Sequence, residues 1–197
     1  MDLKWIGIGA IGLVLVIVVI LIALMFGAYN GMVVKDNAVK SSWSEVENQY
    51  QRQADLIPNL TSILGSSVSV ETKFVKDVTE ARTKWLNAGT QLDREAAGYE
   101  MNQSMATFVS AIATTEAYPT LQANGNFTML MDEVAGTQNR ITVARGRYIE
   151  AVQSYNVTIQ QIPNNFFAGM LGYTEKEYYK ASVPLTTPAL GDGKLPQ

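Results

Sequence analysis

The sequence predicts an all-α protein in which a single N-terminal transmembrane helix is followed by a long antiparallel bundle of three or four helices. Three observations predict this fold class. The run Ile6–Phe26 contains no charged, amide or hydroxyl side chain. Beyond it, apolar residues recur every three or four positions, as on one face of a helix. The chain also lacks strand-like alternation and any glycine-rich phosphate loop placed after a strand.

The apolar run is long enough to cross a bilayer. With Trp5 added, about 22 helical residues at about 1.5 Å each reach roughly 33 Å, and a hydrocarbon layer is about 30 Å thick. A cleaved signal peptide is the alternative, but its apolar core has only about 7 to 15 residues, and no clean A-x-A site follows Phe26. We therefore expect residues 1–28 to be a retained anchor in the lipid bilayer. The residues that mark its ends are Trp5 and Ile6 on one side and Phe26 and Tyr29 on the other. Trp5 and Tyr29 are typical of membrane interfaces.

Three glycines lie inside the span, at Gly7, Gly9 and Gly12. Small residues let helix backbones approach closely, so this patch is a candidate for packing between anchors. Glycine is also frequent in membrane helices generally, and the strict G-x-x-x-G spacing is missing. Incidental glycine is therefore the favoured interpretation.

The bundle is expected over residues 29–173, with its first helix at about residues 30–86. Pro58 lies inside the apolar pattern and predicts a kink near Asp55 to Asn59, because proline removes a backbone N–H and clashes with the preceding turn. Asp55 could cap a restart of the helix. The apolar seam that predicts this helix consists of Val39, Trp43, Val46, Tyr50, Ala54, Ile57, Leu64, Val68, Val78, Ala81 and Trp85.

Two further long helices are expected at residues 91–122 and 126–162, and a short one at 163–171. The short apolar piece either caps the open end of the bundle or dips into a membrane surface. We favour the cap, because the piece lacks the Lys/Arg face of interfacial helices. Residues 174–197, rich in proline towards the end, are expected to be extended or disordered.

Two polar residues, Gln138 and Arg145, fall on the apolar stripe of the third long helix. If buried, they need partners, which Glu47, Glu80 or Glu116 could supply, and such pairs would set the helix register. Alternatively, both lie at the edge of the stripe and Arg145 extends its charge to water.

The composition excludes several function classes. The chain has 197 residues, and the roughly 170 that remain after the anchor is subtracted suit one compact domain. The net charge of −3, with both signs interspersed, disfavours nucleic acid as a partner. Without cysteine or histidine, the chain has no disulfides, thiolate nucleophiles, common zinc sites or imidazole base. We expect a protein that is not an enzyme, with no catalytic residue, no metal and no cofactor. The carboxylate pairs Glu45/Glu47 and Asp132/Glu133 diverge on a helix and are poor catalytic candidates.

Four Asn-x-Ser/Thr sequons are candidate glycosylation sites, at Asn59, Asn102, Asn126 and Asn156. The Asn, Ser and Thr content predicts roughly 1.6 by chance, so the excess is mild. The charges that flank the span nearly balance and do not orient it. These observations favour a single-pass protein of the cell membrane, with a slight lean towards an extracytoplasmic bundle.

Several ordered motifs carry a family resemblance. They are Tyr29-Asn30, Trp43-Ser44-Glu45-Val46-Glu47, Gln49-Tyr50-Gln51-Arg52, Asp55-Leu56-Ile57-Pro58-Asn59-Leu60, Ala117-Tyr118-Pro119, Arg140-Ile141, Val143-Ala144-Arg145, Arg147-Tyr148, Tyr155-Asn156 and the stretch 169–173. Over about the whole chain the sequence resembles the LemA family. It departs at Gln53, where a second Arg is usual in that family, and at Gln138, where Glu is common.

The resemblance implies an N-terminal membrane helix followed by a bundle of long antiparallel helices, and it supplies no reaction. The positions that match its motifs, together with Gln138, are candidates for assembly or helix register: Arg52, Asp55, Pro58, Asn59, Gln138, Arg140, Arg145 and Arg147. Our first functional hypothesis is a membrane-anchored scaffold that forms homo-oligomers. An accessory subunit of a membrane protease or stress-response system is the alternative that the resemblance implies. A surface filament or shell is a third and weaker one.

Overall fold

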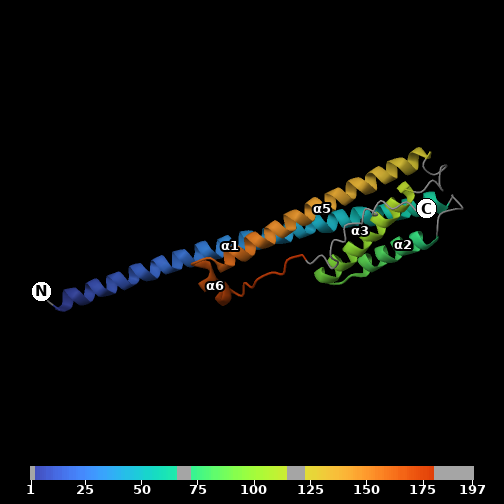
Figure 1. Cartoon of the computed structure of the whole chain (residues 1–197). Helices are drawn as coiled ribbons and strands as arrows, with labels where there is room; N and C mark the ends of the chain where they lie inside the picture. Colours follow the sequence, from blue (N-terminus) through green and yellow to red (C-terminus); the bar gives the residue numbers. More distant parts are fainter. Residues whose placement is uncertain (1–2, 66–71, 115–122, 180–197) are drawn as a thin grey trace, which may run out of the picture. The chain divides into compact units, whose positions relative to one another are not determined.

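A computed structural model describes residues 3–65, 72–114 and 123–179 (Figure 1). Its helices are α1 (Leu3–Gly65), α2 (Thr72–Asn87), α3 (Gln91–Thr114), α5 (Gly125–Gln160) and α6 (Asn164–Leu171). No strand occurs within the described ranges. The predicted all-helical fold class is therefore confirmed. Of the helices described, α1 alone is long and apolar enough to cross a membrane, judged by length and composition.

The first helix, α1, continues without interruption from Leu3 to Gly65. Its apolar residues from Ile11 to Leu24 are all exposed, and from Ile11 onward the first buried position is Ala28. The predicted restart at Asp55 is wrong, because α1 stays helical through Pro58. Instead of capping a helix, the Asp55 carboxylate accepts a hydrogen bond of 2.7 Å from Gln51 Nε2.

A compensating bond explains why α1 tolerates its proline. Pro58 has no N–H for the carbonyl of Ala54, four residues earlier. Arg82 Nε on α2 donates to that same Ala54 oxygen at 2.9 Å. A charged side chain from another helix therefore satisfies the acceptor that proline leaves open.

The bond from Arg82 also shows that one helix over residues 30–86 was a wrong prediction. A straight helix would separate residues 54 and 82 by about 42 Å, whereas α1 ends at Gly65 and α2 begins at Thr72. The chain has therefore reversed direction between α1 and α2. Both helices turn apolar faces inward with the same period, so the seam from Val39 to Trp85 could not show the break.

The remaining boundaries lie close to expectation. The helix expected at 126–162 is α5, and the short piece at 163–171 is α6. The helix expected at 91–122 corresponds to α3 as far as Thr114, and residues 115–122 lie outside the described ranges. Residues 173–179 have no regular structure, and the rest of the expected tail is not described.

The described residues divide into two compact units rather than one bundle. The anchor unit contains residues 3–46 and 144–178, and the bundle unit contains 47–65, 72–114, 123–143 and Tyr179. Both α1 and α5 contribute to each unit, so apolar periodicity along either helix could not reveal the division.

In the anchor unit, α1 and α5 run antiparallel. The rings of Trp43 and Tyr148 meet edge to face with centroids 5.4 Å apart, and Glu45 Oε1 pairs with Arg147 Nη1 at 2.7 Å. The buried apolar residues of this unit are Ala28, Met32, Val39, Trp43, Val46, Ala144, Tyr148, Val152, Tyr155, Ile159, Phe167 and Ala168.

In the bundle unit, α2 and α3 form an antiparallel hairpin. Lys84 pairs with Glu100 at 2.8 Å, and Phe74 meets Phe108 edge to face. The α3 helix runs parallel to α1, as contacts that advance together along both helices show. These are the ion pair Glu47–Arg94 at 2.9 Å, the packing of Gly98 under the Tyr50 ring and the hydrogen bond from Gln53 to Asn102 at 3.0 Å.

Candidate functional site at the end of the apolar helix

Two segments without any charged residue meet in the anchor unit. Residues 5–34 carry no charge, which extends the neutral part of α1 past the apolar run. Residues 151–174, covering the end of α5 and all of α6, carry none either. The rings of Tyr29 and Tyr173 join the two segments edge to face, with centroids 6.5 Å apart.

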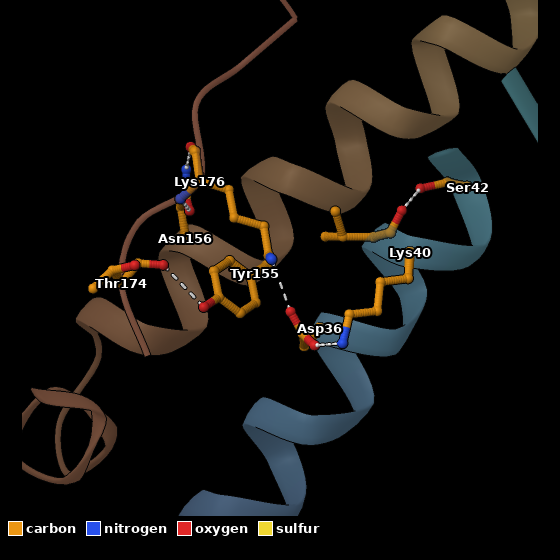
Figure 2. Close-up of polar contacts among 8 residues, drawn as sticks. Asp36, Lys40, Ser42, Tyr155, Asn156, Thr174 and Lys176 are labelled. Carbon is orange, nitrogen blue, oxygen red and sulfur yellow. Dashed lines mark hydrogen bonds and ion pairs between the residues drawn. The ribbon is translucent and has the colours of Figure 1, made fainter. Parts of the chain in front are cut away.

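Immediately beyond both neutral segments lies a charged cluster built on Asp36 of α1. Its carboxylate pairs with Lys40 Nζ at 2.6 Å and with Lys176 Nζ at 2.8 Å (Figure 2). Burial raises the pKa of Asp36, but hydrogen bonds and charge from Lys176 and Lys40 outweigh this effect and lower the pKa below its ordinary value overall. Asp36 therefore stays ionised and ties the C-terminal part of the chain to α1.

Lys176 also lies over an aromatic ring. Its Nζ is 4.9 Å from the centroid of the Tyr155 ring on α5. Burial, together with the negative charge of Asp36, raises the pKa of the Tyr155 hydroxyl. The hydroxyl therefore remains a donor, and it donates to the carbonyl of Thr174 at 2.9 Å.

Residues 173–178, which we name the strap, are held along α5 by a buried amide. Asn156 is only 4% exposed. Its Nδ2 donates to the Lys176 carbonyl at 2.8 Å, and its Oδ1 accepts from the Lys176 N–H at 2.9 Å. Asn156 thus satisfies both backbone groups of one residue, as a neighbouring strand would (Figure 2). Gln160 adds a bond of 2.7 Å to Glu175 at the exposed edge.

These contacts restrict the glycosylation candidates. A glycan would be attached to the side-chain nitrogen that Asn156 uses inside the unit, so the structure argues against this site. Asn102 is half-buried and accepts from Gln53, whereas Asn59 and Asn126 are exposed. Glycosylation at the latter three positions stays a prediction.

The anchor candidates are described in part. The structure does not describe the side chains of Trp5 and Ile6 or the surroundings of Gly7 and Gly9. Gly12 faces open space, with no atom within 4 Å of where a Cβ would stand. Phe26 is exposed.

The candidates for assembly or helix register differ in their contacts and in their exposure. Arg147 joins α5 to Glu45 of α1, whereas Arg140 pairs within α5 with Glu133 and Thr137. Arg52 and Asn59 are exposed on α1. Among these four residues, Arg147 therefore links two helices within the anchor unit.

The two polar residues on the apolar stripe of α5 are half-buried. Gln138 Nε2 has no hydrogen-bond partner among the described residues, and the side chain of Arg145 is half-buried. Of the three expected partners, Glu47 pairs with Arg94, Glu80 pairs with Lys76, and Glu116 lies outside the described ranges.

Sequence reasoning missed Asp36, Lys176 and Arg82 as structural residues. A usable signal existed for the first two, because they are among the first charges after the neutral segments 5–34 and 151–174. For Arg82, the signal was Pro58, which leaves the Ala54 carbonyl without its helical N–H and in need of another donor. In the sequence, Asn156 stands out only as part of a family motif and of a sequon.

The described side chains show ion pairing at most of the carboxylates considered for catalysis. Glu45, Glu47 and Glu133 each pair with an arginine. Within the described ranges, no group of three or more Asp and Glu residues could hold a metal ion.

The fold and this junction define a class: an all-helical, membrane-associated protein whose N-terminal helix is long and apolar enough for a membrane. The chain belongs to the LemA family, because the family model matches residues 42–189. The resemblance seen in the sequence motifs is thereby confirmed.

Curated relatives are magnetosome proteins by name. Two MamQ proteins of Paramagnetospirillum magneticum are each 25% identical to this chain, over 91% of it and 76% of their own length. MamQ of Magnetospirillum gryphiswaldense is 23% identical, over 85% of this chain and 72% of its own.

Proposed function

We propose that this protein is a membrane-anchored, non-enzymatic scaffold that assembles into homo-oligomers at a membrane surface. The observation that carries the proposal is the single helix α1, which is exposed and apolar from Ile11 to Leu24 and packed from Ala28 onward. Such a helix joins a lipid-facing segment to the helical units without a flexible linker.

The side-chain chemistry of the chain supports a binding role over a catalytic one. The chain has no histidine or cysteine, and its described carboxylates at Glu45, Glu47 and Glu133 form ion pairs with arginine. The family and its MamQ relatives name no reaction. The open space around Gly12 supports contact between anchors, since small residues permit close helix packing.

The test is the mass of the full-length protein in nanodiscs, with electron microscopy of the gently extracted protein alongside. A uniform oligomer, ring or filament is the expected result. A lone protomer overturns self-assembly. Co-purification of a membrane protease with single protomers would replace the scaffold by an accessory subunit.

A pair of matched variants asks whether the anchors drive assembly. Substitution of Gly7, Gly9 and Gly12 by leucine should reduce the oligomer to smaller species. The control changes Val14, Val18 and Val19 to leucine, which enlarges the span without touching its glycines. Equal masses for the two variants would reject packing through the glycines.

A further inference from the structure

The short helix α6 turns a large apolar surface outward. Phe166 is 76% exposed and Met170, one turn later on the same face, is 64% exposed. Ile162, in the turn before the helix, is 87% exposed. Only Phe167 and Ala168 of α6 are buried. The predicted role as a cap for the core accounts for these two residues and leaves the outer face unexplained.

The position of α6 along α1 is given by the tyrosine contact. Tyr173, just after α6, touches Tyr29, which lies three residues, or about 4.5 Å, beyond the end of the apolar run at Phe26. The headgroup zone on each side of a bilayer is about 5 to 8 Å thick. With the run in the hydrocarbon, the end of α6 lies at the level of the headgroups.

The backbone keeps the helix at this level. Gly172 adopts φ 79°, in the left-handed region, and ends α6, and the N–H of Tyr173 bonds to the Ala168 carbonyl at 2.9 Å. The strap then leads away to the first charges, at Glu175 and Lys176. Neutral residues therefore lie on the lipid side of the Asp36 cluster.

We propose that α6 is a second membrane contact, with Ile162, Phe166 and Met170 inserted at the boundary between headgroups and acyl chains beside the span. This inference rests on the proposed anchoring of α1. Because residues 151–174 carry no charge, the contact depends on the burial of apolar side chains and not on attraction to anionic lipid. The contact of Tyr173 with Tyr29, at the end of the apolar run of α1, argues for lipid as the occupant.

The chain has no cysteine, so single-cysteine variants can be labelled cleanly. Phe166→Cys and Met170→Cys, each carrying an environment-sensitive fluorophore, are placed as full-length protein in phosphatidylcholine nanodiscs. Quenching by lipids spin-labelled at different depths is then measured. Leu21→Cys, in the span, is the lipid reference, and Met129→Cys, 72% exposed in the bundle unit, is the control for an exposed apolar site.

Labels at positions 166 and 170 should report a depth of about 5 to 10 Å into the boundary. The label at position 21 should lie deeper and that at 129 should remain unquenched. Replacement of part of the lipid by phosphatidylglycerol should leave the depths unchanged.

If positions 166 and 170 behave like 129 while 21 is quenched, α6 is not in lipid, although the anchor stands. If position 21 also escapes quenching, anchoring and this inference both fail. Blue-shifted emission at 166 without lipid quenching would assign the surface to a second copy of the chain and overturn the proposal.

Discussion

The anchor unit and the bundle unit use buried polar groups for different tasks. In the anchor unit, Asn156 binds the backbone of the strap, which has no regular structure. In the bundle unit, Gln53, which is fully buried, binds the side chain of Asn102 and joins two helices. A buried amide therefore replaces missing backbone pairing in the anchor unit and aligns regular helices in the bundle unit.

The largest effect should come from Asn156→Ala, because both backbone groups of Lys176 lose their partner. We expect a loss of about 2 kcal/mol in the free energy of unfolding and faster amide hydrogen exchange over residues 173–178. The exposed Gln160→Ala, which also removes a bond to the strap, is the control and should have little effect. Equal exchange in the two variants would contradict the role given to Asn156.

The bundle unit offers a comparable test at the proline of α1. Arg82→Met should cost about 1.5 kcal/mol, because the Ala54 carbonyl loses its charged donor. In a Pro58→Ala background a backbone N–H is restored to that carbonyl, so the same change should cost clearly less. A double-mutant cycle by chemical denaturation measures this coupling. Identical costs in both backgrounds would show that Arg82 does not compensate for Pro58.

A smaller effect is expected at Gly98, where an added Cβ would stand 2.9 Å from the Tyr50 ring. Tyr50 is buried, so its ring has little room to move. We expect Gly98→Ala to destabilise by about 1 kcal/mol despite the higher helix propensity of alanine. At Gly136 the nearest atoms belong to the Arg140 side chain at 3.7 Å. Gly136→Ala should therefore be neutral or stabilising. Thermal unfolding of both variants, compared with the unchanged protein, measures these two effects.

The smallest effect is expected in how the stability of the protein falls at acidic pH. The folded-state pKa of Asp36 is lowered, so its contribution to stability is present above the unfolded value of about 3.9 and is lost as the pH falls below it. Asp36→Asn should flatten the decline of unfolding free energy between about pH 5 and about pH 2. Lys176→Met should make the same decline of the unfolding free energy shallower, but less so than Asp36→Asn. An unchanged acid limb in both variants would show that the cluster contributes nothing measurable.

The fold class, α5 and α6 could be predicted because apolar periodicity and turn residues are local signals. The reversal between α1 and α2 could not, since two helices facing one core continue the same period. The strap was equally hidden. Its attachment depends on Asn156 and Lys176, whose contact is between residues 20 apart in sequence, and nothing in local propensity indicates such a pairing.

The candidate site was predicted only in outline. The end of the apolar run marked Tyr29, but its partner Tyr173 follows α6 and required the fold. Arg147 pairs with a residue of another helix, whereas Asp55 and Arg140 bond within their own helices. Sequence motifs identify which polar residues match the family pattern, and only the packing decides whether they face another helix or water.

Because α1 is one unbroken helix, the number of residues between two positions determines whether they lie on the same side of it. The 27 residues from Gly12 to Val39 make about seven and a half turns at 3.6 residues per turn. Gly12 therefore faces away from the side on which Val39 is buried with α5. Two copies that met through Gly12 would carry their α5 helices and straps on opposite outer flanks, so that dimer formation in the lipid would leave α5 and α6 of both copies free for other contacts.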